Sequence, residues 1–355
     1  MDTPHWHNTL EWSSLWEEVF AVSTTQERIS QQLLSSNVLG FAGKWKAILL
    51  NILPNDDSPD LKNHIYELVE ESFETIWGAT GTGKKTDKYN DELFRQLVIV
   101  DNNKTLMWWY RVAPVKEHIF DGQIRSPMGD FFQFNENYLE YMKQNNYLEL
   151  WTARINKQLD DRQKIYPLFG LWDGIAYLVD EYRSGGFIGK LTIPTRYNAD
   201  AADFALSYLD KFFGTTAHDV ATPKKDIYDY RIRHTDETLK RFDTYLQTLT
   251  GNYLSDEKSL QTILREICLA STTPGQLESR LPNMFPMYLS RFSSLHYTGT
   301  IKNGNVSESW IAASTHDIHD SVRETHFGVV EKRKKQFGEQ KMSLREYLTK
   351  LHHIS

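Results

Sequence analysis

The densest group of potential metal ligands in the sequence is formed by His316, His319 and Asp320. On a helix, His316 and Asp320 are four residues apart and His319 shares their face, so the three side chains could converge on one divalent metal ion. This spacing gives the hypothesis of a metal-dependent hydrolase. The alternative is an exposed helix start, because Thr315 followed by acidic residues is typical of an N-cap, and Arg323 would place a cation among the ligands.

A run of basic residues near the C-terminus locally reverses the acidic balance of the chain. Aromatic side chains are interleaved with it, and such a segment could follow a phosphate backbone, where each neutralised phosphate adds affinity through counterion release. The candidate nucleic-acid-binding residues are Lys332, Arg333, Lys334, Lys335, Lys341 and Arg345. The alternative is a solvated helix end, because the helix dipole favours basic residues at its C-terminus.

The stretch Gly78–Lys84 matches the first seven positions of a phosphate-binding P-loop. A P-loop needs Ser or Thr at the next position, because that hydroxyl binds the magnesium ion, and here Lys85 stands there with Thr86 one place late. The segment before it has the apolar period of a helix rather than the pattern of a buried strand. We therefore expect a mobile linker that binds no nucleotide.

The stretch Asp121–Arg125 reads Asp-Gly-Gln-Ile-Arg and follows an expected strand. It resembles the Asp-Gly-Gln-x-Arg stretch of ParB-like nucleotide-hydrolysing restriction proteins, a resemblance that covers five residues. Together with the basic C-terminal segment, it favours a prokaryotic-type intracellular protein acting on or alongside nucleic acid, such as a defence or mobile-element component. A simple Asp-Gly turn is the alternative.

The composition is that of a globular protein rather than a disordered or fibrous one. Hydrophobic residues are 40% of the chain, charged residues are 25% and the formal net charge is −7. No apolar stretch is long enough to span a membrane, and the single cysteine, Cys268, cannot form an internal disulfide. We therefore expect a cytoplasmic protein with no membrane partner, in which Cys268 is buried in an apolar helix.

Aromatic residues are abundant, with 10 Trp, 18 Tyr and 18 Phe. Large rings contribute strongly to protein interfaces, and no catalytic motif in the sequence is complete. A further hypothesis is therefore a non-catalytic interaction or assembly subunit that binds a protein partner or forms a homo-oligomer. The sequence leaves open whether the protein is an enzyme.

Most periodic stretches of the sequence have the apolar spacing of helices, and fewer have the pattern of strands. Helices are expected over 10–20, 26–34, 45–53, 58–77, 135–159, 171–182, 199–213, 237–249 and 257–270. Strands are expected over 97–100, 106–112 and 187–193.

The expected fold class is α+β and predominantly helical, with a helical N-terminal lobe, a small central antiparallel sheet and a helical C-terminal region. A chain of 355 residues exceeds the usual size of one compact core, roughly 250–300 residues. We expect three regions: a helical lobe over 1–86, a mixed α+β region over 87–214, and a mainly helical region with a basic tail over 215–355.

Overall fold

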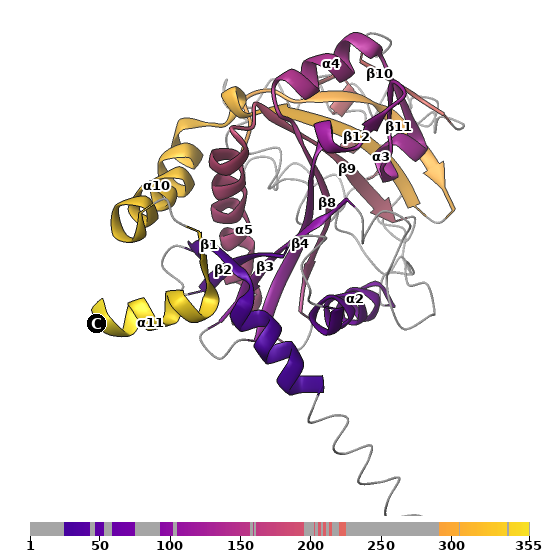
Figure 1. Ribbon diagram of the computed structural model, residues 1–355. Coiled ribbons are helices and arrows are strands. Elements are labelled where there is room, and N and C mark those ends of the chain that lie inside the picture. Colours follow the sequence, from indigo (N-terminus) through magenta and orange to yellow (C-terminus); the bar gives the residue numbers. More distant parts are fainter. Residues whose placement is uncertain are drawn as a thin grey trace, which may run out of the picture.

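A large mixed β-sheet forms the centre of the computed structural model (Figure 1). The model describes residues 25–42, 47–52, 59–74, 93–101, 105–156, 159, 161–194, 202, 205–206, 209–210, 213–214, 220–224, 291–304, 306–338 and 341–354. The expected P-loop-like linker, the expected helices over 10–20, 237–249 and 257–270, and Cys268 lie outside these residues.

The described part of the chain places nine strands in this sheet, in the order β11-β12-β9-β8-β4-β3-β2-β1-β13. The strands are β1 (Asn37–Ala42), β2 (Ala47–Ile52), β3 (Arg95–Val100), β4 (Leu106–Pro114), β8 (Leu148–Ile155), β9 (Gly186–Pro194), β11 (His296–Asn303), β12 (Val306–Ser314) and β13 (Met342–Ser343). Neighbouring strands run antiparallel except for β8 and β9, which run parallel. A parallel pair needs a crossover connection, and the helix α5 (Asp161–Tyr182) provides it.

Two small sheets accompany the large one. The strand β5 (Ile119–Phe120) pairs with β6 (Gln123–Ile124), and β7 (Phe132–Phe134) pairs with β10 (Ala221–Pro223). The hairpin between β5 and β6 turns at Asp121 and Gly122, whose φ angles of 51° and 68° are the left-handed values of a tight turn. The Asp-Gly-Gln-Ile-Arg stretch therefore forms a simple Asp-Gly turn, which was the alternative to the resemblance to restriction proteins.

Helices cover both faces of the large sheet. On one face, called here the α5 face, α5 and α10 (Asp320–Phe337) pack over a core that includes Leu97, Trp108 and Phe187. The opposite face carries two cores. One lies under α2 (Pro59–Glu74), α11 (Leu344–Ile354) and a helix over 25–35; the other lies near α3 (Pro127–Phe131) and α4 (Glu136–Gln144).

The strands of the large sheet are buried on both faces, and this explains most of their sequence pattern. All nine residues of β4 are buried, and all but Arg111 are apolar, so β4 shows no apolar–polar alternation. Adjacent residues still point to opposite faces, since Trp108 belongs to the core under α5 and Trp109 to the core under α2.

The prediction of a predominantly helical fold with a small antiparallel sheet is wrong, because the sheet is large and mixed. The expected helix over 45–53 is the strand β2, and the expected helix over 135–159 divides into α4 and β8. Short apolar runs in doubly covered strands fit both a helical and an extended period, so spacing alone misassigned them. The division into three regions stays a prediction.

Candidate functional site

The parallel strands β8 and β9 separate along their length. They pair only at Leu148 with Phe187, Glu149 with Ile188 and Leu150 with Gly189. Beyond these three pairs, β8 continues against β4 and β9 continues against β12. The sheet is therefore forked at the carboxyl ends of its parallel strands, where open α/β sheets commonly bind ligands.

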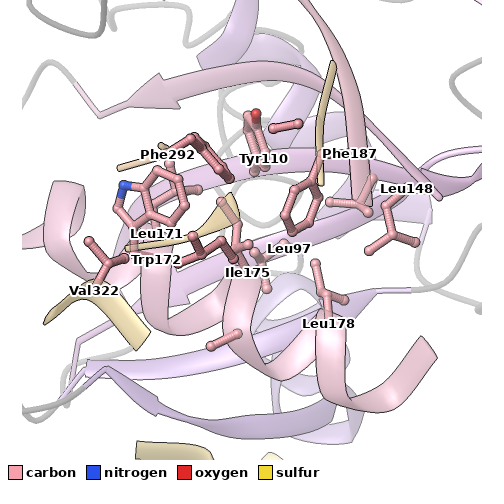
Figure 2. Close-up of a cluster of buried hydrophobic side chains, with 14 of the residues drawn as sticks. Leu97, Tyr110, Leu148, Leu171, Trp172, Ile175, Leu178, Phe187, Phe292 and Val322 are labelled. Atoms are coloured by element: carbon pink, nitrogen blue, oxygen red, sulfur yellow. The ribbon is translucent and has the colours of Figure 1, made fainter. Parts of the chain in front are cut away.

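An apolar cavity begins at this fork and lies on the α5 face. Figure 2 shows Trp172 and Ile175 of α5 facing Tyr110, Phe187 and Phe292. The cavity has about 70 Å³ of free space. One water molecule needs about 10–15 Å³, so this space can hold several carbon atoms of an apolar ligand. The lining residues are Tyr110, Leu150, Trp172, Ile175, Phe187, Ile188, Gly189, Lys190, Leu191, Phe292, Leu295, Ile311, Ala312 and Ala313.

Two buried contacts fix the wall that α5 contributes. The His326 Nδ1 of α10 lies 2.7 Å from the Asp173 Oδ1 of α5, and both side chains are almost inaccessible to solvent. The hydroxyl of Tyr177 donates a hydrogen bond of 3.3 Å to the carbonyl of Val329. Burial raises the pKa of Asp173, and the hydrogen bond and charge of His326 oppose that rise. These contacts hold Trp172, next to Asp173, in place.

The opposite face of the sheet is polar at the fork. The Lys190 ammonium lies 4.1 Å from the centre of the Trp151 ring and forms an ion pair with the buried carboxylate of Glu308. Burial, together with the nearby charge of Arg111, lowers the pKa of Arg154 to about 10. Arg154 therefore remains positively charged at neutral pH, and the fork has an apolar side and a charged side.

A histidine–carboxylate pair lies at the base of the fork. The Nε2 of His118 lies 3.0 Å from the Oε2 of Glu149, and neither side chain is accessible to solvent. Glu149 precedes Leu150, the last β8 residue paired with β9. A carboxylate can only accept, so in the neutral ring Nε2 donates and Nδ1 keeps its lone pair. That Nδ1 has no hydrogen-bond partner among the described residues.

The expected metal ligands lie outside the fork. His316 is exposed in a short 3-10 helix (Thr315–Asp317), His319 is half-buried just before α10, and Asp320 is the exposed first residue of α10. The hydroxyl of Ser314 caps the 3-10 helix by accepting from the His316 amide. Within the described residues, no three His, Cys, Asp or Glu side chains are grouped so that they could hold a metal ion.

The expected nucleic-acid-binding residues lie on α10, on α11 and between them. Lys334 contacts Asp180 at 2.7 Å, Lys341 contacts Glu181 at 2.6 Å, and the buried Arg333 donates to the carbonyl of Gly338. Lys332, Lys335 and Arg345 are exposed. Two of these charges, Lys334 and Lys341, therefore pair with carboxylates of α5.

Sequence reasoning missed the residues at the fork. His118 and Glu149 are 31 positions apart, and Asp173 and His326 are 153 apart, so no local spacing connects them. One available signal was Gly189, a glycine inside a strand whose neighbours on the same face are large and apolar.

The chain has a relative among known proteins, at low sequence identity. No family model matches the chain. The chain is similar to a glycine N(alpha)-acyltransferase of Phocaeicola vulgatus, with 25% identity over 324 residues that cover 87% of this chain and 92% of the relative. This similarity contradicts the hypothesis of a nucleic-acid-associated defence protein, and neither the assembly subunit nor the metal-dependent hydrolase matches it. Among the described residues, no helix is long and apolar enough to cross a membrane.

Proposed function

We propose that the protein is an N-acyltransferase that moves an acyl group from an activated donor, such as a thioester, to the α-amino group of an amino acid such as glycine. The observation that carries the proposal is the similarity to the glycine N(alpha)-acyltransferase over most of both chains. The forked sheet supports it, because an acylation site needs an apolar place for the acyl chain beside a polar place for the amino acid.

The two sides of the fork fit the two substrates. The apolar cavity between α5 and β9 is the place for the acyl chain. On the other face, Arg154 keeps its positive charge at neutral pH, which suits the carboxylate of an amino acid. Where the strands diverge, β8 and β9 no longer pair with each other, which leaves a place for the carbonyl of the acyl group between them.

The reaction requires removal of a proton from the amino group. The nitrogen lone pair attacks the thioester carbonyl carbon, the C–N bond forms, the C–S bond breaks, and the departing thiolate takes up a proton. We assign proton acceptance to His118, because its Nε2 is fixed by Glu149 and its Nδ1 keeps a lone pair. Glu149 orients the ring through this 3.0 Å contact.

The test incubates the purified protein with a saturated acyl thioester and a panel of amino acids. Free thiol is followed by a colorimetric reagent and N-acyl products by mass spectrometry. We expect a product with glycine or another small amino acid, and we expect His118→Gln to lower kcat by about 10²–10⁴-fold with KM nearly unchanged. Thiol release that does not depend on any amino acid would contradict the proposal.

A further inference from the structure

The cavity wall contains one position without a side chain, at the point where the two parallel strands part. Alternate residues of β9 point to the α5 face, and there Phe187, Leu191 and Ile193 are large, apolar and buried. Gly189 interrupts this row and lines the cavity. A glycine inside a strand often marks the place where a ligand approaches the backbone closely.

Among the described residues, only Leu150 borders the space at Gly189. A Cβ atom at this position would lie 3.2 Å from the Leu150 carbonyl oxygen and 3.9 Å from the Leu150 Cβ, and apart from the chain neighbours no other described residue has an atom within 4 Å of it. At Gly186 of the same strand, a Cβ atom would instead lie 2.3 Å from the Tyr147 ring. Packing therefore explains Gly186, whereas Gly189 leaves open the cavity itself.

The opposite wall limits the depth of the cavity. Ile175 and Trp172 of α5 line it. The centre of the Trp172 ring lies 5.7 Å from that of Phe292 and 5.9 Å from the guanidinium of Arg291. One α-helical turn along α5, Leu178 is equally buried but does not line the cavity. Figure 2 shows Leu178 beyond Ile175 on the same helix.

We propose that this cavity binds the hydrocarbon tail of a fatty acyl group, and that Gly189 and Ile175 together set the length of chain that it accepts. This inference rests on the proposed function, since it names the donor of the same reaction as a fatty acyl compound. Each methylene that enters the cavity contributes about fourfold in affinity, until the chain meets the α5 wall and the gain stops.

Two substitutions should move that limit in opposite directions. Gly189→Val adds about three carbon atoms to the β9 wall and should shorten the best-bound chain by about the same number. Ile175→Ala removes about three carbon atoms from the α5 wall and should lengthen it correspondingly. Leu178→Ala is the matched control, because it removes as many carbon atoms from the same buried helix away from the cavity.

The experiment measures binding and turnover separately. Saturated free fatty acids of increasing length displace a fluorescent fatty acid from the wild type and the three variants, and the corresponding acyl thioesters are compared in kcat/KM with glycine. We expect opposite shifts for Gly189→Val and Ile175→Ala and no shift for Leu178→Ala. A wild type that binds no fatty acid, or variants with the wild-type preference, would overturn the inference.

The two readouts distinguish this inference from the proposed function. Opposite shifts in fatty-acid binding without any N-acyl product would support the acyl pocket and contradict the acyltransferase. Glycine acylation with one chain-length preference in all four proteins would support the acyltransferase and contradict the role of Gly189 and Ile175. Thermal unfolding of each variant identifies a folding failure, in which case Gly189→Ala and Ile175→Val repeat the comparison with smaller changes.

Discussion

The buried pair of His326 and Asp173 should respond unequally to removal of its two members. His326→Leu leaves the Asp173 carboxylate buried without the partner that now lies 2.7 Å away, whereas Asp173→Asn leaves a neutral amide that can still accept from the imidazole. Removing one partner of a buried charged pair costs about 3–5 kcal/mol. We therefore expect His326→Leu to lose about that much unfolding free energy, and Asp173→Asn to lose clearly less.

The stability loss predicted for His326→Leu should change with pH, in a direction set by the pKa of Asp173. Burial raises the folded-state pKa of Asp173 above the unfolded value, so the folded protein favours the protonated carboxyl. The stability that this protonated carboxyl contributes is lost as the pH rises through the folded-state pKa. Without His326, which lowers that pKa, the cost of the charge increases. The defect of His326→Leu should therefore be largest near neutral pH and become smaller as the pH falls.

Urea unfolding of the wild type and both variants, at about pH 5 and about pH 8, measures these differences. Double substitution to Asp173→Leu with His326→Leu should recover part of the loss, because it removes the buried charge together with its partner. An equal loss for His326→Leu at both pH values, or a larger loss for Asp173→Asn than for His326→Leu, would refute the reasoning.

Three further expectations follow from single contacts. Gly40→Ala should lower the free energy of unfolding in urea by about 1–3 kcal/mol, because its Cβ would lie 2.1 Å from the Tyr177 ring. Gly328→Ala in α10, whose Cβ would meet no atom of the described residues within 4 Å, should raise it by about 0.5–1 kcal/mol. Lys190→Met should lower the free energy of unfolding, because it leaves buried Glu308 without its ion pair, and adding Glu308→Gln should restore part of that loss. No restoration in the double variant would mean that the unpaired Glu308 charge is not the cause. Lys334→Ala should change stability by less than about 1 kcal/mol, because its partner Asp180 is at the surface, and a larger change would mean that the pair is shielded from solvent.

The sequence predicted the local elements better than their assembly. Strands at 97–100, 106–112 and 187–193 are confirmed as parts of β3, β4 and β9. The error over 135–159 arose where α4 ends at Asn145 and Asn146, the latter with a φ angle of 50°. Two consecutive asparagines are a readable helix stop, and the apolar–polar alternation at the start of β8 was visible after them.

The candidate site could not be assembled from the sequence, because its parts come from distant segments. The parallel pairing of β8 with β9 depends on the α5 crossover, and only this pairing brings Glu149 beside Ile188 and creates the fork. In the sequence, His326 lies seven residues after His319 and ten after His316, yet its partner is Asp173, 153 residues away. The charged and histidine-rich segments that suggested a site lie on and beside the C-terminal helices, whereas the cavity is lined mainly by ordinary apolar residues.

The most direct test of the central claim is mass spectrometry of the product formed from ¹⁵N-labelled glycine and a saturated acyl thioester. We predict an N-acylglycine that carries the label, formed at a rate that depends on glycine concentration and that falls steeply in His118→Gln. Recovery of only intact thioester or free fatty acid, with no label in any acylated product, would contradict the account.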